Sequence, residues 1–137
     1  MENQTLLPEP VPSLLTRPFW DACSQHKLVV QRCCDCGRLR FYPTASCPFC
    51  ACEVSTWDEM SGRGGIYSWT RVERSPDPAW AKLAPYVSVV VELKEQKHLL
   101  IPGLLVQSPD FDGSQSEVEV CFEEVGASVL PRWRLTR

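Results

Sequence analysis

Four cysteines in two pairs of equal spacing are the residues of this chain whose types and positions point most directly to chemistry. Cys33 and Cys36 form one C-x-x-C pair, and Cys47 and Cys50 form a second pair after ten intervening residues. Thiolates in this pattern can occupy the corners of a tetrahedron, a geometry that Zn²⁺ adopts with Zn–S bonds of about 2.3 Å. Because four sulfur ligands leave no open coordination position, we expect a structural Zn²⁺ that activates no water.

Two other uses of the cysteines remain open at this stage. The chain has eight cysteines, enough for a disulfide framework. However, its first residues lack the basic and apolar segments of a secretory signal, so we expect a reducing, cytoplasmic location. Iron could replace zinc, as in a rubredoxin, because the second pair reads Cys-Pro-x-Cys. The other cysteines are expected to be small, partly buried side chains: Cys23, Cys34, Cys52 and Cys121.

Composition narrows the classes of partner. The 137 residues carry 14 Lys and Arg against 17 Asp and Glu, a net charge of −3, and four thiolates on one Zn²⁺ would make it more negative. This balance argues against general nucleic-acid binding. No apolar run approaches the roughly 20 residues that span a bilayer, so no membrane partner is expected.

The elements that must position the cysteines divide the chain into four segments. Pro8, Pro10 and Pro12 favour an extended path before a short helix, which Thr16 could cap and which runs to about Gln25. Apolar pairs in the first segment favour its docking on a partner over disorder. The expected segments are an extended proline-rich arm (1–16), the helix and zinc ribbon (17–52), an OB-fold barrel (53–126) and a basic C-terminal tail (127–137).

Alternation of apolar and polar residues predicts strands after the second cysteine pair. In one of them, Val87, Val89 and Val91 share a face, as expected for a half-buried strand. Five short strands with glycines at their bends suit a small closed barrel, for which the OB-fold is the common five-stranded form. The expected strands are 54–60, 66–73, 86–93, 98–106 and 117–123. The fold class is thus mainly β, with a short N-terminal helix, a rubredoxin-like zinc ribbon and then a five-stranded OB-fold barrel.

The order of several motifs resembles a known family. The rubredoxin-like zinc ribbon plus OB-fold proteins that accompany thiolases and related acyl-CoA enzymes are similar to this chain over about residues 17–134. The motifs that carry the resemblance are Pro18-Phe19-Trp20, Gln31-Arg32-Cys33, Phe41-Tyr42-Pro43, Cys47-Pro48-Phe49-Cys50, and Ser61-Gly62-Arg63-Gly64 leading to Tyr67-Ser68-Trp69-Thr70.

The resemblance implies a non-catalytic subunit of a hetero-oligomer, which docks on a thiolase-fold protein and helps to shape a shared coenzyme A thioester site. The family's zinc ligands carry over onto Cys33, Cys36, Cys47 and Cys50, whereas no catalytic position carries over. Family members accompany acetoacetyl-CoA thiolase, hydroxymethylglutaryl-CoA synthase, a steroid side-chain retro-aldolase and benzoylsuccinyl-CoA thiolase. The free-standing form and the proline-rich arm favour the small subunit of the last of these.

Independent catalysis is not expected. A thiolase needs a cysteine activated by a nearby base, and the only histidines, His26 and His98, lie in no motif with a nucleophile. Cys121 falls among glutamates, whose charge should raise the pKa of its thiol and blunt its reactivity.

Contacts with a partner or with CoA are predicted for four residues, each with a simpler alternative. Trp80 lies in a proline-broken loop and would be either an interface residue or a lid folded back over the barrel. In the tail, the guanidinium groups of Arg132 and Arg134 would pair with a CoA phosphate or a partner carboxylate, with Trp133 as a further contact, or the tail would be solvated. A single-stranded nucleic-acid binder is the alternative function, because Tyr67, Trp69 and Arg71 share one strand face as a stacking platform would.

Overall fold

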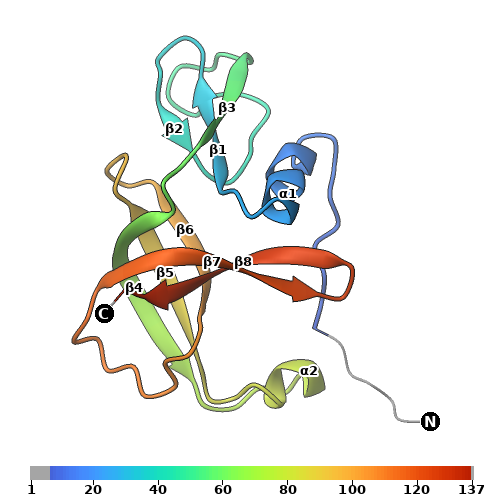
Figure 1. The fold of residues 1–137 in the computed structure, drawn as a ribbon. Coiled ribbons are helices and arrows are strands. Elements are labelled where there is room, and N and C mark those ends of the chain that lie inside the picture. The colour runs from blue at the N-terminus through green and yellow to red at the C-terminus, as the bar shows by residue number, and fades with distance from the viewer. Residues whose placement is uncertain (1–6, 137) are drawn as a thin grey trace.

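The computed structural model describes residues 7–136, in which a small three-stranded sheet stands on one end of a closed β-barrel (Figure 1). Residues 1–6, the first part of the expected arm, and Arg137 of the expected tail lie outside this range. The small sheet has the order β2-β1-β3, with β1 at Val29–Cys33, β2 at Leu39–Arg40 and β3 at Ser55–Glu59. It is preceded by helix α1, Arg17–Ser24.

The barrel closes with its strands in the order β4-β5-β6-β8-β7. All neighbouring strands pair antiparallel except β6 and β8, which are parallel. Its strands are β4 at Arg63–Val72, β5 at Tyr86–Leu93, β6 at Leu100–Leu105, β7 at Glu117–Val125 and β8 at Ser128–Leu135. A one-turn helix α2, Pro78–Ala81, lies at the end of the barrel away from the small sheet (Figure 1). This is the five-stranded OB-fold arrangement that the sequence predicts. None of the helices within residues 7–136 is long and apolar enough to cross a bilayer.

Two of the sequence-predicted assignments need correction. The strand predicted at 54–60 forms, as β3, but it pairs with β1 through the register pair Gln31↔Trp57 and so extends the ribbon past the expected boundary at residue 53. The fifth barrel strand is instead β8, in the segment predicted to be a basic tail. It pairs with β7 from Val118↔Leu135 to Val125↔Ser128, because a tight turn at Gly126, with φ of +61°, folds the chain back as a hairpin.

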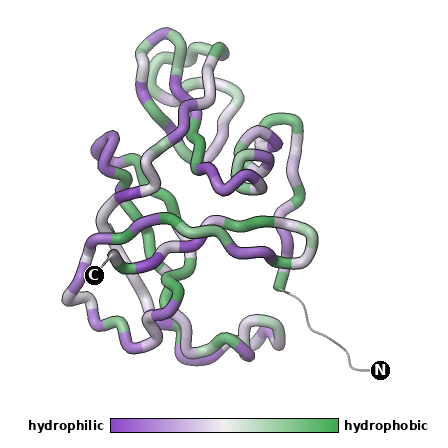
Figure 2. The backbone as a smooth tube through the Cα atoms, viewed as in Figure 1, coloured by the Kyte–Doolittle hydropathy of each residue, from purple (hydrophilic) through white to green (hydrophobic). Residues whose placement is uncertain are grey.

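A single hydrophobic core runs from the small sheet into the barrel. Val87, Val89 and Val91 are each at most 1% exposed, which confirms the face predicted for this strand. Phe19 of α1 joins the same core and lies 5.3 Å, centroid to centroid, from Phe41 of the ribbon. In Figure 2 the long hydrophobic stretches lie along the barrel strands, whereas α1 carries both hydrophobic and hydrophilic residues.

The largest fully buried side chain is Trp133 of β8, at 0% exposure. It fits because Gly103 on β6 has no side chain: a Cβ there would lie 2.9 Å from Cδ1 of the indole. Van der Waals contact requires a greater separation, so the two positions depend on each other.

The described part of the arm contains no helix or strand before Ser13 and is anchored to the barrel through Glu9. Its Oε1 accepts hydrogen bonds from the N–H of Ala127 (3.1 Å) and the hydroxyl of Ser128 (2.7 Å) at the β7–β8 turn. At the start of α1, Thr16 occupies the N-cap position, but its hydroxyl makes no capping bond and accepts from the N–H of Ser13 (2.9 Å) instead.

Candidate metal centre

The two cysteine pairs meet at the end of the ribbon sheet where β1 stops. Cys33 ends β1 and Cys36 lies in the turn toward β2, whereas Cys47 and Cys50 lie in the long connection from β2 to β3. All four Sγ atoms lie within 4.8 Å of one another. Segments that are distant in the sequence are therefore brought together at one point, as the C-x-x-C spacing predicts.

The distances between the sulfurs fit a tetrahedral metal site and exclude disulfides. Sγ of Cys33 lies 3.5 Å from Sγ of Cys50, and Sγ of Cys36 lies 3.7 Å from Sγ of Cys47. Four ligands at about 2.3 Å from a central Zn²⁺ stand about 3.8 Å apart in a regular tetrahedron, whereas a disulfide requires about 2.05 Å. All eight cysteines of the chain are free.

Each knuckle is built in the same way. The chain turns back so that the N–H of Gly37 donates to the carbonyl of Cys33 (3.0 Å) and the N–H of Ala51 donates to the carbonyl of Cys47 (2.8 Å). Both turn residues have positive φ, +76° at Gly37 and +68° at Ala51. Glycine adopts this conformation freely, but alanine is strained there by roughly 1–2 kcal/mol.

Backbone N–H groups point at the sulfurs. The N–H of Asp35 donates to Sγ of Cys33, and the N–H of Phe49 donates to Sγ of Cys47, both at 3.4 Å. The pKa of Cys33 is lowered to about 6, chiefly by the backbone N–H of Cys36 and against the effect of desolvation. Against the effect of the backbone N–H of Cys52, the contact with the sulfur of Cys33 raises the pKa of Cys50 to about 12. Thiolates are the species that ligate metals, so a bound cation would relieve this competition between neighbouring sulfurs.

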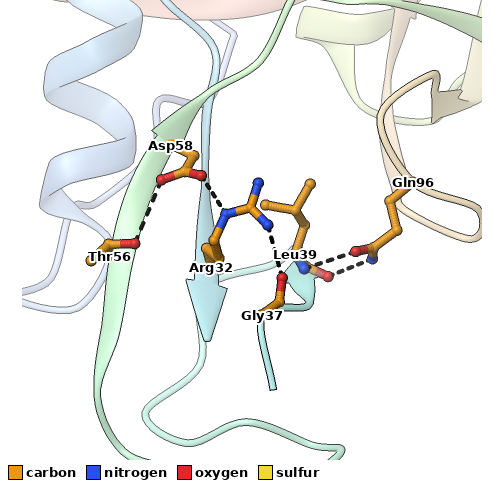
Figure 3. Close-up of polar contacts among 6 residues, drawn as sticks. All are labelled: Arg32, Gly37, Leu39, Thr56, Asp58 and Gln96. Carbon is orange, nitrogen blue, oxygen red and sulfur yellow. Dashed lines mark hydrogen bonds and ion pairs between the residues drawn. The ribbon is translucent and has the colours of Figure 1, made fainter. Parts of the chain in front are cut away.

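Polar contacts hold the first knuckle on the sheet (Figure 3). The Arg32 guanidinium donates through Nε to Asp58 of β3 and through Nη1 to the carbonyl of Gly37 (2.8 Å). Asp58 also accepts from the hydroxyl of Thr56 (3.5 Å). With four protein ligands and this support, a bound Zn²⁺ would fix the ribbon and would have no open position for substrate.

Outside the ribbon, the predicted contact residues do not gather into one site. Trp133 is a core residue and not a contact residue, since it is fully buried. Arg132 is 7% exposed and donates through Nε to Glu123 (3.0 Å), whereas Arg134 points to solvent and donates to Glu119 (2.8 Å). Trp80 is half-buried, with its ring 5.4 Å from that of Tyr86.

Gln96 is a contact residue that sequence reasoning missed. Its side-chain amide pairs with the backbone of Leu39 in β2, accepting from the N–H (2.9 Å) and donating to the carbonyl (2.7 Å), as Figure 3 shows. Residues 94–97 were predicted only to connect two strands. A polar side chain in a turn gives no sequence signal of a long-range partner, so nothing in the pattern could have identified this contact.

Among the described residues, no cysteine thiol forms a hydrogen bond with a histidine that could act as its base. The hydrogen bonds of the thiols go to other thiols or to the backbone, and the His26 ring stacks on Phe122 at 5.3 Å. The pKa of Cys121 is raised, as predicted, but burial is the main cause and Glu123 a smaller one, while Arg134 opposes both.

The strand face considered for nucleic acid is partly occupied. Tyr67 and Trp69 are 58% and 38% exposed, but Trp69 packs edge to face against Phe111 at 5.0 Å. Arg71 lies 5.9 Å from the Trp69 ring and donates a hydrogen bond to the carbonyl of Phe111. Tyr67 is therefore the more open of the two rings on this strand.

A four-cysteine zinc ribbon joined to an OB-fold barrel defines a two-module class of protein. Residues 20–51 match the family described as "ChsH2, rubredoxin-like zinc ribbon domain", and residues 57–134 match "ChsH2, C-terminal OB-fold domain". The chain belongs to this ChsH2 (DUF35) family of zinc ribbon plus OB-fold proteins.

Individual relatives agree with this family. A "DUF35 domain-containing scaffold protein" of Methanocaldococcus jannaschii is 33% identical over 82% of this chain and 79% of its own length. A "Probable enoyl-CoA hydratase alpha subunit" of Thermomonospora curvata is 39% identical over 67% of this chain. The aligned region covers only 28% of that longer protein.

Solved structures share the fold. A chain described as "Ltp2-ChsH2(DUF35) aldolase" superposes with a TM-score of 0.80 at 28% identity, covering 94% of this chain and 100% of that one. A DUF35-family protein of unknown function from Sulfolobus solfataricus gives a TM-score of 0.62 at 11% identity, covering 89% of this chain and 85% of that one, and supports the fold alone.

Proposed function

We propose that this protein is a non-catalytic scaffold subunit that docks on a thiolase-fold acyl-CoA enzyme and helps to form its coenzyme A thioester site. The observation that carries the proposal is the similarity, over 94% of this chain and the whole of the other, to the chain from the Ltp2–ChsH2(DUF35) aldolase. Within residues 7–136, the free thiols and the histidines form no catalytic constellation, so the partner would supply the chemistry.

The ribbon and the barrel would each present a surface to the partner, with the thioester held where the two proteins meet. Exclusion of water there would strengthen polar contacts around the thioester. Zinc would contribute rigidity, since structural sites of this kind contribute on the order of 10–16 kcal/mol to folding in finger peptides. We place this complex in the cytoplasm, where free thiols persist.

The reaction of the partner has two candidates. The likeness to an aldolase subunit supports retro-aldol cleavage of an acyl-CoA. Thiolysis of a β-oxoacyl-CoA such as benzoylsuccinyl-CoA rests only on the general resemblance to thiolase accessory proteins. We therefore favour aldol cleavage, and assay of the purified complex with both substrate types distinguishes the two.

Co-expression with a thiolase-fold protein encoded beside this chain tests the proposal. We expect the two to co-purify and the partner alone to be less active. Cys36→Ser should abolish association by unfolding the ribbon, whereas Cys34→Ser, at an exposed cysteine outside the metal cluster, should leave it intact. Separate purification of the two proteins, with a partner that is equally active alone, would refute the proposal.

Single-stranded nucleic-acid binding is the second candidate, because Tyr67 remains exposed on the barrel. Fluorescence anisotropy with a labelled oligonucleotide at low salt tests it. Tight, salt-sensitive binding that is lost in Tyr67→Ala would favour this function over the scaffold role.

A further inference from the structure

Basic residues line a pocket of about 440 Å³ where the ribbon meets the barrel. The pocket opens between β2, the second cysteine knuckle and the β5–β6 turn. None of the described residues that line it is acidic, and four are basic: Arg38, Arg40, Lys97 and His98. On a chain whose net charge is −3, this concentration of positive charge favours an anionic ligand.

Arg40 is a buried cation that forms no salt bridge with the described residues. It is 6% exposed, and it donates through Nε to the Gln31 side chain (3.0 Å) and through Nη2 to the Thr44 carbonyl (3.2 Å). Both partners are neutral, and Nη1 has no partner among the described residues. A buried charge is costly unless it is compensated, so an anion bound in this pocket would supply the missing counter-charge.

An aromatic face lies beside the basic groups. The Arg38 guanidinium carbon stands 4.2 Å from the centroid of the Phe49 ring, and Phe49 is 57% exposed. Phe41 also lines the pocket. Guanidinium planes and aromatic rings are the surfaces on which nucleotide bases stack. The pocket therefore combines groups for a phosphate with groups for a base.

The turn that carries Lys97 and His98 is held in place from both sides. Glu95 accepts a hydrogen bond from the N–H of Ser61 (2.6 Å) in the ribbon–barrel connection, and Gln96 pairs with Leu39 as described above. The N–H of His98 donates to Glu92 (2.8 Å). In Figure 2 this turn is a hydrophilic loop below the ribbon. Fixed positions lower the entropy cost of binding a ligand.

We propose that this pocket binds a nucleotide, with Lys97 and Arg38 contacting its phosphates and the Phe49 side of the pocket receiving its base. The inference deepens the proposed function, and it rests on that function for the identity of the nucleotide as the adenosine phosphate end of a CoA thioester. It assigns the contact to the ribbon–barrel junction, and not to the C-terminal arginines.

Isothermal titration calorimetry of the zinc-loaded full chain, without any partner, tests the pocket. The probes are 3′,5′-ADP, adenosine and inorganic phosphate. We expect saturable binding of 3′,5′-ADP that weakens as the ionic strength rises from about 0.01 to about 0.15 M, which shortens the Debye length from about 30 to about 8 Å. Adenosine and phosphate alone should each bind at least about tenfold more weakly, because each makes only part of the contacts.

Lys97→Gln and Arg38→Gln should each weaken binding of 3′,5′-ADP about tenfold. Lys82→Gln makes the same change in charge beyond α2, at the other end of the barrel (Figure 1), and should bind normally.

Absence of binding by the wild-type chain, or equal binding by the Lys97 and Lys82 variants, would overturn the proposal. Equal affinity for phosphate and 3′,5′-ADP would overturn the base-binding part. Co-purification with a thiolase-fold protein is measured separately, so failure of either proposal is distinguishable.

Discussion

The side-chain amide of Gln96 forms two hydrogen bonds with the backbone of Leu39, 57 residues away in the sequence, at 2.9 and 2.7 Å. Leu39 belongs to β2 of the ribbon, and Gln96 belongs to the β5–β6 turn of the barrel. The amide continues the backbone hydrogen bonding of a two-residue strand. It thereby bridges two modules whose sheets share no strand pairing.

Gln96→Ala should destabilise the protein by about 1–2 kcal/mol, since each lost hydrogen bond contributes roughly 1 kcal/mol. Thermal unfolding measures this loss. Gln115→Ala, at an exposed loop position, is the matched control and should be neutral. Hydrogen exchange at the Leu39 amide should quicken in the Gln96 variant alone. Unchanged exchange there would show that the amide does not hold the ribbon.

The strained knuckle residue gives a pair of opposite predictions. Ala51→Gly should stabilise the folded, zinc-bound ribbon by about 1 kcal/mol, because glycine removes the strain of positive φ. Gly37→Ala should destabilise it by a similar amount, and purely through conformation, since no atom lies within 4 Å of the added Cβ. Competition with a chelator measures the effect as zinc affinity. A change of the same sign in both variants would contradict the shared knuckle geometry.

The metal itself can be identified and removed. We expect one zinc per chain and a colourless protein, whereas ferric iron in a four-sulfur site is red. Chelation, or Cys47→Ser, should unfold the ribbon, because ligation and folding of such sites are coupled. Near-ultraviolet circular dichroism and limited proteolysis report this loss. A ribbon that keeps its protection from protease without metal would rule out a zinc-dependent fold.

Substitution of Trp133 tests whether this residue belongs to the core or to a contact surface. Trp133→Ala should cost about 3–5 kcal/mol of unfolding free energy, as expected for a large buried side chain. Trp80→Ala, at a half-buried ring on Tyr86, should cost clearly less. Chemical denaturation of both variants makes the comparison. Equal, small losses would return Trp133 to the surface role that the sequence predicted.

The reactivity of the cysteine thiols should decrease as their burial increases. Burial raises the pKa of Cys23 to about 12, and this side chain is 0% exposed, so it should not react with a thiol reagent near pH 8 while the protein is folded. Cys34 is exposed and should react first. Mass spectrometry of partly labelled, zinc-loaded protein identifies the order. Rapid labelling of Cys23 would mean that α1 opens readily from the core.

The cysteine site could be predicted because its spacing alone limits the geometry to a few solutions. The alternation of Val87, Val89 and Val91 likewise identified a core strand, since a period of two admits one buried face. The last barrel strand was missed because Pro131 and its neighbouring arginines are typical of a tail, although proline is tolerated in a strand with a sparsely paired edge. Here β6 pairs with β8 only through Leu105↔Trp133. Strand partners, as for β3, depend on which edges meet in space, and the local pattern does not contain that information.

The carboxylate of Glu9 occupies the space that a side chain at Gly126 would need, with Oε2 only 2.3 Å from the position of a Cβ there. Anyone who trims the first dozen residues for crystallisation or binding assays would therefore change more than a tail. The amide of Ala127 and the hydroxyl of Ser128 would lose their bonds to Glu9 and would hydrogen-bond to water. The shortened protein would then present a different surface at the β7–β8 hairpin from the one that it presents with the arm in place.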